Sequence, residues 1–179
     1  MMKSAILIID VQSILFDPVP RPFEADLVVE RINRITSWAR SNNLMVIYVQ
    51  HEAAGSEIEF GSVGWQLQTG LNVEECDEFV RKTTPDSFLR TNLDALLKES
   101  DVEHLIVCGY ASEFCVDTTV RRAAGLGYSV ELVSDAHTTH DKSHASAEQI
   151  RAHHNATLPN ISSFGTKIAT VTADELTSR

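Results

Sequence analysis

The chain has 179 residues, of which 43% are hydrophobic and 22% charged, a composition typical of one globular domain with a full core. Its formal net charge of −10 argues against nucleic acid or an anionic membrane surface as a partner. The N-terminus lacks a signal-peptide pattern, no apolar run approaches the ~20 residues of a membrane span, and the number of cysteines is odd. We therefore expect a single domain over residues 1–179 that has free thiols and works in the reducing cytoplasm.

The first half of the chain begins with an apolar run over residues 4–9 that ends at Asp10. This pattern predicts a buried strand that delivers a carboxylate to the carboxyl edge of a sheet. A helix over 23–42 and a second strand over 44–49 follow. Residues 51–71 have no regular period, and a loop of this length is typical of a lid or pocket wall. A subunit contact or a plain surface loop is an equally good interpretation.

The second half continues the alternation of strands and helices. The expected elements are a strand over 78–81, a helix around Leu93 and Leu97 that Ser87 or Thr91 caps, strands over 105–108 and 128–133, a helix between them that Gly125 and Gly127 end, a helix over 143–155, a strand over 168–171 and a short last helix after Thr172. Cys115 falls where the helix after the 105–108 strand begins. The alternation predicts right-handed βαβ units, and hence an α/β fold of three layers with a parallel sheet between helices. The hydrophobic first strand is expected at its centre.

Three reactive side chains follow strands of this sheet: Asp10, Lys82 and Cys115. The carboxyl ends of parallel strands meet at one edge, where open α/β sheets bind their ligands. A thiol with a pKa near 8.5 needs a base or a positive neighbour to act as a nucleophile, and we expect Lys82 and the helix N-terminus to favour the thiolate. Asp10 can accept its proton. The backbone N–H groups of Ala111 and Cys115 are candidates for an oxyanion hole. Cys108, inside a strand, is interpreted as core.

The residues that carry this pattern resemble a known family, the isochorismatase-like cysteine hydrolases, which include nicotinamidases, N-carbamoylsarcosine amidases and isochorismatase. The resemblance covers nearly the whole chain and rests on four blocks in order: IIDVQ at 8–12, KTTPDSF at 82–88, GYASEFCVDTT at 109–119 and SDA at 134–136. It implies a catalytic triad of Asp10, Lys82 and Cys115 and a non-proline cis peptide between Tyr110 and Ala111. It also implies a Rossmann-like sheet of six parallel strands in the order 3-2-1-4-5-6 and a homo-oligomer.

The chain departs from the nicotinamidases after the second strand. Those enzymes place an aspartate and at least two histidines there to bind a metal, whereas residues 48–52 read YVQHE and keep only His51. The sequence therefore disfavours nicotinamide as the substrate and predicts no metal and no other cofactor. His137, His140 and His144 also suggest a metal site, but no second cluster joins them, and a polar turn that packs the next helix is favoured.

The expected activity is hydrolysis of a C–N bond, of amide or ureido type, in a small molecule. Two alternatives stay open: vinyl-ether hydrolysis by Asp10, as in isochorismatases that lack the cysteine, and a catalytically idle oligomeric scaffold of the same fold. The residues expected to bind the substrate lie on the loops at the carboxyl edge of the sheet. They are Gln12, Phe16, His51, Phe60, Trp65 and Tyr110, with Glu113 beside them.

Overall fold

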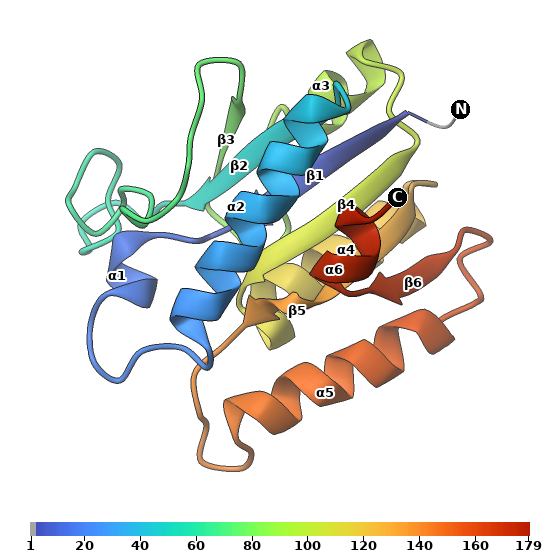
Figure 1. Ribbon diagram of the computed structural model, residues 1–179. Coiled ribbons are helices and arrows are strands. Elements are labelled where there is room, and N and C mark those ends of the chain that lie inside the picture. The colour runs from blue at the N-terminus through green and yellow to red at the C-terminus, as the bar shows by residue number, and fades with distance from the viewer. Residues whose placement is uncertain (1–2) are drawn as a thin grey trace.

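The computed structural model describes residues 3–179, and its centre is a sheet of six parallel strands in the order β3-β2-β1-β4-β5-β6 (Figure 1). The strands are β1 (Ser4–Ile9), β2 (Met45–His51), β3 (Glu78–Lys82), β4 (His104–Tyr110), β5 (Ser129–Thr138) and β6 (Ile168–Val171). β1 lies between β2 and β4. Both the predicted fold class and the predicted strand order are confirmed.

Helices cover both faces of the sheet. They are α1 (Ser13–Phe16), α2 (Ala25–Ser41), α3 (Leu93–Glu99), α4 (Asp117–Gly125), α5 (Ala147–Thr157) and α6 (Ala173–Thr177), with a π-helical turn η1 (Ser112–Val116) and a 3₁₀ turn η2 (Leu158–Asn160). Figure 1 shows α2 and α6 together in front of the sheet and α4 behind it. No helix between residues 3 and 179 is both long enough and apolar enough to cross a membrane.

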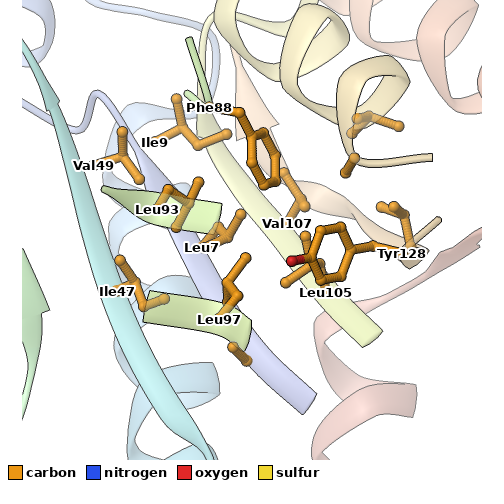
Figure 2. Close-up of a cluster of buried hydrophobic side chains, with 14 of the residues drawn as sticks. Leu7, Ile9, Ile47, Val49, Phe88, Leu93, Leu97, Leu105, Val107 and Tyr128 are labelled. Carbon is orange, nitrogen blue, oxygen red and sulfur yellow. The ribbon is translucent and has the colours of Figure 1, made fainter. Parts of the chain in front are cut away.

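The two faces of the sheet form separate hydrophobic clusters because successive strand residues point in opposite directions. Leu7 and Ile9 of β1 belong to one cluster, and Ile6 and Ile8 to the other. Figure 2 shows the first cluster, in which alternate residues of β1, β2 and β4 face Leu93, Leu97, Phe88 and Tyr128. β1 is buried on both faces, so its end is rigidly placed at the middle of the sheet.

Some element boundaries differ from the sequence-based expectation. α2 begins at Ala25 rather than at residue 23, because Glu24 has a left-handed φ of 52° that no helix accommodates. α5 begins at Ala147, where Ser146 and Gln149 form a capping box, and not at residue 143. β5 extends to Thr138, five residues past the expected end at 133, and therefore includes His137.

Candidate active site

Three elements bring Asp10, Lys82 and Cys115 together at the carboxyl edge of the sheet. Asp10 directly follows β1, Lys82 is the last residue of β3, and Cys115 lies in η1 after β4. Lys82 Nζ is 2.7 Å from Asp10 Oδ2 and 3.3 Å from Cys115 Sγ. The three residues that the sequence singled out as a reactive group are therefore in mutual contact through the lysine.

The ammonium group of Lys82 has a third partner, His51 Nδ1, at 3.3 Å. A lysine ammonium carries three N–H donors, so Asp10, Cys115 and His51 together can accept all of them. The Lys82 side chain is 0% exposed and that of Asp10 is 2% exposed. A buried charge of each sign is tolerated here because the two lie in direct contact.

His51 reaches this position because its backbone is held by Gln12. The Gln12 amide accepts a hydrogen bond from the His51 N–H at 2.9 Å and donates to the His51 carbonyl at 3.0 Å. It also donates to the carbonyl of Trp65 at 2.8 Å. Burial, and then the charge of Lys82, lower the pKa of His51 below its usual value, which favours the neutral ring that can accept from Lys82.

One oxygen of Asp10 is free of protein partners. Oδ1 is buried and makes no hydrogen bond to any of the residues 3–179. The Asp10 backbone is left-handed, with a φ of 51°, and its N–H donates to the Val49 carbonyl at 2.8 Å. A buried carboxylate oxygen without a partner can accept a proton from a nearby thiol or from a water molecule.

The protonation state of Cys115 differs from the expectation that helix position and Lys82 favour the thiolate. Burial is the largest influence, the negative charge of Asp10 acts in the same direction, and together they outweigh Lys82 and raise the Cys115 pKa to about 12. The thiol is therefore protonated in the free site at neutral pH. A nucleophile in this state needs a base at the moment of attack, and Asp10 is in a position to be that base.

The chain approaches Cys115 through a close contact between β4 and β1. Gly109 has a φ of 115°, and a Cβ there would lie 2.1 Å from the carbonyl oxygen of Ile9. Only glycine fits this contact. The Tyr110–Ala111 peptide bond that follows is cis, as the family resemblance implied.

A cavity of about 230 Å³ opens over these residues. Its lining is made by Asp10, Leu15, His51, Ile58, Pro85, Tyr110, Ala111, Phe114 and Cys115. At ~30 Å³ for each water molecule the space corresponds to about seven or eight waters, the volume of a small organic molecule. Ala111 and Cys115, the expected oxyanion-hole residues, both line it. His51 and Tyr110 line it as well, in agreement with their expected position.

Four of the expected substrate-binding residues do not line the cavity. The Gln12 side chain is fully buried, and its amide forms hydrogen bonds with the backbones of His51 and Trp65. Phe16 is also fully buried and packs edge-on against the Tyr110 ring, with ring centres 5.9 Å apart. Both residues support cavity walls from behind and are out of reach of a ligand in the cavity.

Phe60 and Trp65 line a different hollow, between the long loop, β3 and residues 90–92. Their rings pack edge-on at 4.8 Å, and the Arg81 guanidinium lies 3.9 Å from the centre of the Phe60 ring. The loop contributes Ile58 to the cavity in their place. Glu113 faces away from the cavity, accepting from Thr139 at 2.9 Å and pairing with Lys142.

Sequence reasoning missed the apolar walls of the cavity: Leu15, Ile58, Pro85 and Phe114. Pro85 and Phe114 belong to the conspicuous blocks at 82–88 and 109–119, and Phe114 directly precedes the cysteine, so their positions gave a usable signal. Leu15 and Ile58 lie in a single helical turn and in an irregular loop, where no periodicity indicates which side chains point inward.

The three candidate histidines of the 137–144 segment do not form a cluster. His137 lies inside β5, not in a polar turn, where its ring bonds Ser112 Oγ at 2.8 Å and Asn155 Oδ1 at 2.9 Å. His140 Nδ1 lies 2.8 Å from the Tyr110 hydroxyl. Within residues 3–179 no group of three or more His, Cys, Asp or Glu side chains is arranged to hold a metal ion.

Comparison with known proteins gives consistent matches. The sequence profile of the isochorismatase domain matches residues 4–166. Streptothricin hydrolase from Streptomyces noursei is 36% identical over 138 residues, which cover 76% of this chain and 50% of that protein. A ureidoacrylate amidohydrolase from Variovorax paradoxus is 28% identical over 135 residues, which cover 75% of this chain and 50% of that protein. The chain thus spans about half the length of these curated relatives.

A solved structure described as an isochorismatase family protein is also similar in both sequence and fold. It is 35% identical to this chain, and the two superpose with a TM-score of 0.87 over 94% of this chain and 98% of that one. The similarity therefore extends over nearly the whole chain.

Proposed function

This chain belongs to the isochorismatase family of hydrolases, and from that premise we propose that it is a cysteine hydrolase acting on the C–N bond of a small amide or ureido compound. The observation that carries the proposal is the contact of Lys82 Nζ with both Asp10 Oδ2 and Cys115 Sγ, at 2.7 and 3.3 Å, beside a cavity of substrate size. The names of two relatives, streptothricin hydrolase and ureidoacrylate amidohydrolase, support hydrolysis in general and amide chemistry in particular.

The first half of the proposed reaction forms a thioester. Cys115 Sγ attacks the carbonyl carbon, the thiol proton passes to Asp10, and the electron pair of the C=O π bond moves to oxygen. The N–H groups of Ala111 and Cys115 are the proposed donors to that oxyanion. When the carbonyl reforms, the C–N bond breaks and Asp10 returns the proton to the departing nitrogen. Lys82 stays charged throughout and stabilises both anions.

The second half regenerates the thiol. A water molecule attacks the thioester carbon while Asp10 accepts one of its protons, and the C–S bond breaks as Asp10 passes that proton to the sulfur. In this scheme Asp10 acts first as a base and then as an acid, which requires a carboxylate oxygen that is not already hydrogen-bonded to the protein. Oδ1, which has no hydrogen-bond partner among residues 3–179, meets that requirement.

The test is turnover of a panel of small primary amides, ureido compounds and vinyl ethers, with detection of ammonia or product. For an amide that is hydrolysed, Cys115→Ala is expected to lower kcat by at least about 1,000-fold. Cys76→Ser is the matched control, because Cys76 is an exposed free thiol. Hydrolysis of a vinyl ether that survives Cys115→Ala but not Asp10→Asn would replace this proposal with the isochorismatase reaction. An absence of any turnover and any adduct on Cys115 would favour an idle scaffold.

A further inference from the structure

The walls of the cavity are apolar on every side of the reactive group. Leu15 comes from α1, Ile58 from the loop after β2, Pro85 from the segment after β3, and Ala111 and Phe114 from the region after β4. Four separate segments of the chain thus present carbon surface to the same small volume. Such walls favour a ligand whose substituent is itself apolar.

The cationic and hydroxyl groups beside the cavity already have partners, whereas Asp10 Oδ1 has none among residues 3–179. The Lys82 ammonium contacts Asp10, His51 and Cys115. The Tyr110 hydroxyl lies 2.8 Å from His140 Nδ1. A carboxylate on a substrate would therefore enter the cavity without a cation that is free to receive it.

The nearby charges outside the cavity do not change this conclusion. Lys142 stands 5.7 Å from the centre of the Phe114 ring, but its ammonium group pairs with Glu113 at 3.3 Å. The net charge of −10 repels anions from the molecule as a whole. Placing an unpaired carboxylate against apolar walls removes its hydration without replacement, which strongly disfavours binding.

We propose that this cavity selects small amides with a compact aliphatic or aromatic substituent and rejects amides that carry a carboxylate. The inference rests on the proposed function, since it names the substrate class of the same site. It sets this chain apart from a relative named for ureidoacrylate, which is a carboxylate.

The first test compares two amides of the same shape, 4-methylpentanamide and succinamate, in which an isopropyl group replaces a carboxylate. Ammonia release by the full chain is measured for both, with Cys115→Ala as the blank. We expect kcat/KM to be at least about 100-fold higher for 4-methylpentanamide. Equal values, or a preference for succinamate, would overturn the inference while leaving the proposed hydrolase activity intact.

The second test does not depend on turnover. The corresponding aldehydes, 4-methylpentanal and succinic semialdehyde, can form a reversible hemithioacetal: Cys115 Sγ bonds to the aldehyde carbon, the C=O bond becomes a C–O single bond, and the thiol proton ends on that oxygen. Binding is read from protection of Cys115 against alkylation. If no amide is hydrolysed but 4-methylpentanal binds at least about 100-fold more tightly, the proposed function fails and the inference on selectivity stands. Equal binding, or no binding of either aldehyde, refutes the inference.

A positive charge introduced into the wall should weaken the selectivity against a carboxylate. Ile58→Arg places a cation in the lining, and we expect the ratio of succinamate to 4-methylpentanamide activity, or of the two aldehyde affinities, to rise at least about tenfold. Val63→Arg is the matched control, because Val63 lies in the same loop but is 85% exposed and outside the cavity lining. The same rise in both variants would mean that overall charge, and not the cavity wall, determines the preference.

Discussion

Lys82 Nζ lies 2.7 Å from Asp10 Oδ2, and the two side chains are 0% and 2% exposed. The residues are 72 positions apart in the chain and are brought together because β3 and β1 end at the same edge of the sheet. Neither charge has access to bulk water, so each depends on the other for its stability. The pair that the proposed reaction uses is thus also a structural element of the fold.

The first prediction follows from this pairing. Lys82→Met is expected to lower the free energy of unfolding by about 3–5 kcal/mol, because it leaves the Asp10 carboxylate buried without its partner. The double variant Asp10→Asn, Lys82→Met should recover part of that loss, since no charge is then left unpaired. Denaturant unfolding at pH 7 measures all of these values.

Lys3→Met provides the matched control for this loss of a lysine charge. Lys3 forms an ion pair with Asp101 at 3.2 Å, but the two side chains are 62% and 82% exposed. An exposed pair contributes at most about 1 kcal/mol. A loss for Lys82→Met no larger than that for Lys3→Met would contradict the assigned role of the buried pair.

The second prediction concerns the reactivity of Cys115. Because burial and Asp10 raise its pKa to about 12, alkylation by iodoacetamide should be slow at pH 7 and accelerate about tenfold for each pH unit up to pH 10. The exposed Cys76 should be labelled first at neutral pH. Peptide mapping by mass spectrometry distinguishes the two thiols. A rate at Cys115 that levels off near pH 7 would show that its thiolate forms in the free protein.

The sequence was sufficient to predict the reactive group but not its electrostatics. Asp10 and Lys82 each follow a strand, and parallel strands of a covered sheet place their carboxyl ends together, so their proximity follows from topology. The pKa of Cys115 depends instead on how deeply the thiol is buried, which no local pattern records. The sequence predicted a lowered pKa for Cys115, whereas burial raises it.

The cavity walls were the least predictable part of the site. Phe16 and Leu15 are adjacent in a four-residue helix, and sequence alone does not indicate which of them faces inward. Gln12 was a reasonable candidate for substrate binding, but its amide forms hydrogen bonds with the backbone of His51 instead. In the long loop, Ile58 lines the cavity and the more conspicuous Phe60 and Trp65 do not. The loop has no regular secondary structure, so no periodicity indicates which of its side chains point inward.

The third prediction tests the role of His51 as an acceptor for Lys82. The His51 pKa is lowered by burial and by the charge of Lys82, so the ring is neutral at pH 7 and becomes protonated only below the usual value of about 6.5. Protonation removes the acceptor and places a second positive charge beside the lysine. We expect kcat to fall on the acid side as this happens, and His51→Leu to lower kcat at least about tenfold at all pH values.

His51→Gln separates this role from a merely structural one. The glutamine side chain keeps an oxygen that can accept from Lys82 but does not titrate, so kcat should be partly retained and its decline at acid pH reduced. His153→Gln, a change at an exposed histidine, should have the wild-type profile. If His51→Gln declines with pH in the same way as the wild type, the titrating group is another residue and the assignment to His51 is wrong.

The fourth prediction concerns His137, which connects the active-site turn to α5. Its Nε2 donates to Asn155 Oδ1 at 2.9 Å, and its Nδ1 lies 2.8 Å from the hydroxyl of Ser112, the first residue of η1. Complete burial lowers the His137 pKa to about 4, whereas an unfolded histidine titrates near 6.5. Between these two values the unfolded chain binds a proton that the folded chain does not.

The sign of the effect follows from this difference in bound protons. The contribution of His137 to stability is fully present above pH 6.5 and is lost as the pH falls towards 4, by up to about 3 kcal/mol.

Urea unfolding at pH 7 and at pH 4 measures the loss in the wild type, to which carboxylates and other histidines also contribute. His137→Gln removes the titrating ring, so this variant should lose about 3 kcal/mol less over the same interval. His153→Gln, at an exposed position, should lose as much as the wild type. Equal losses in the wild type and in His137→Gln would mean that the buried ring does not couple stability to pH.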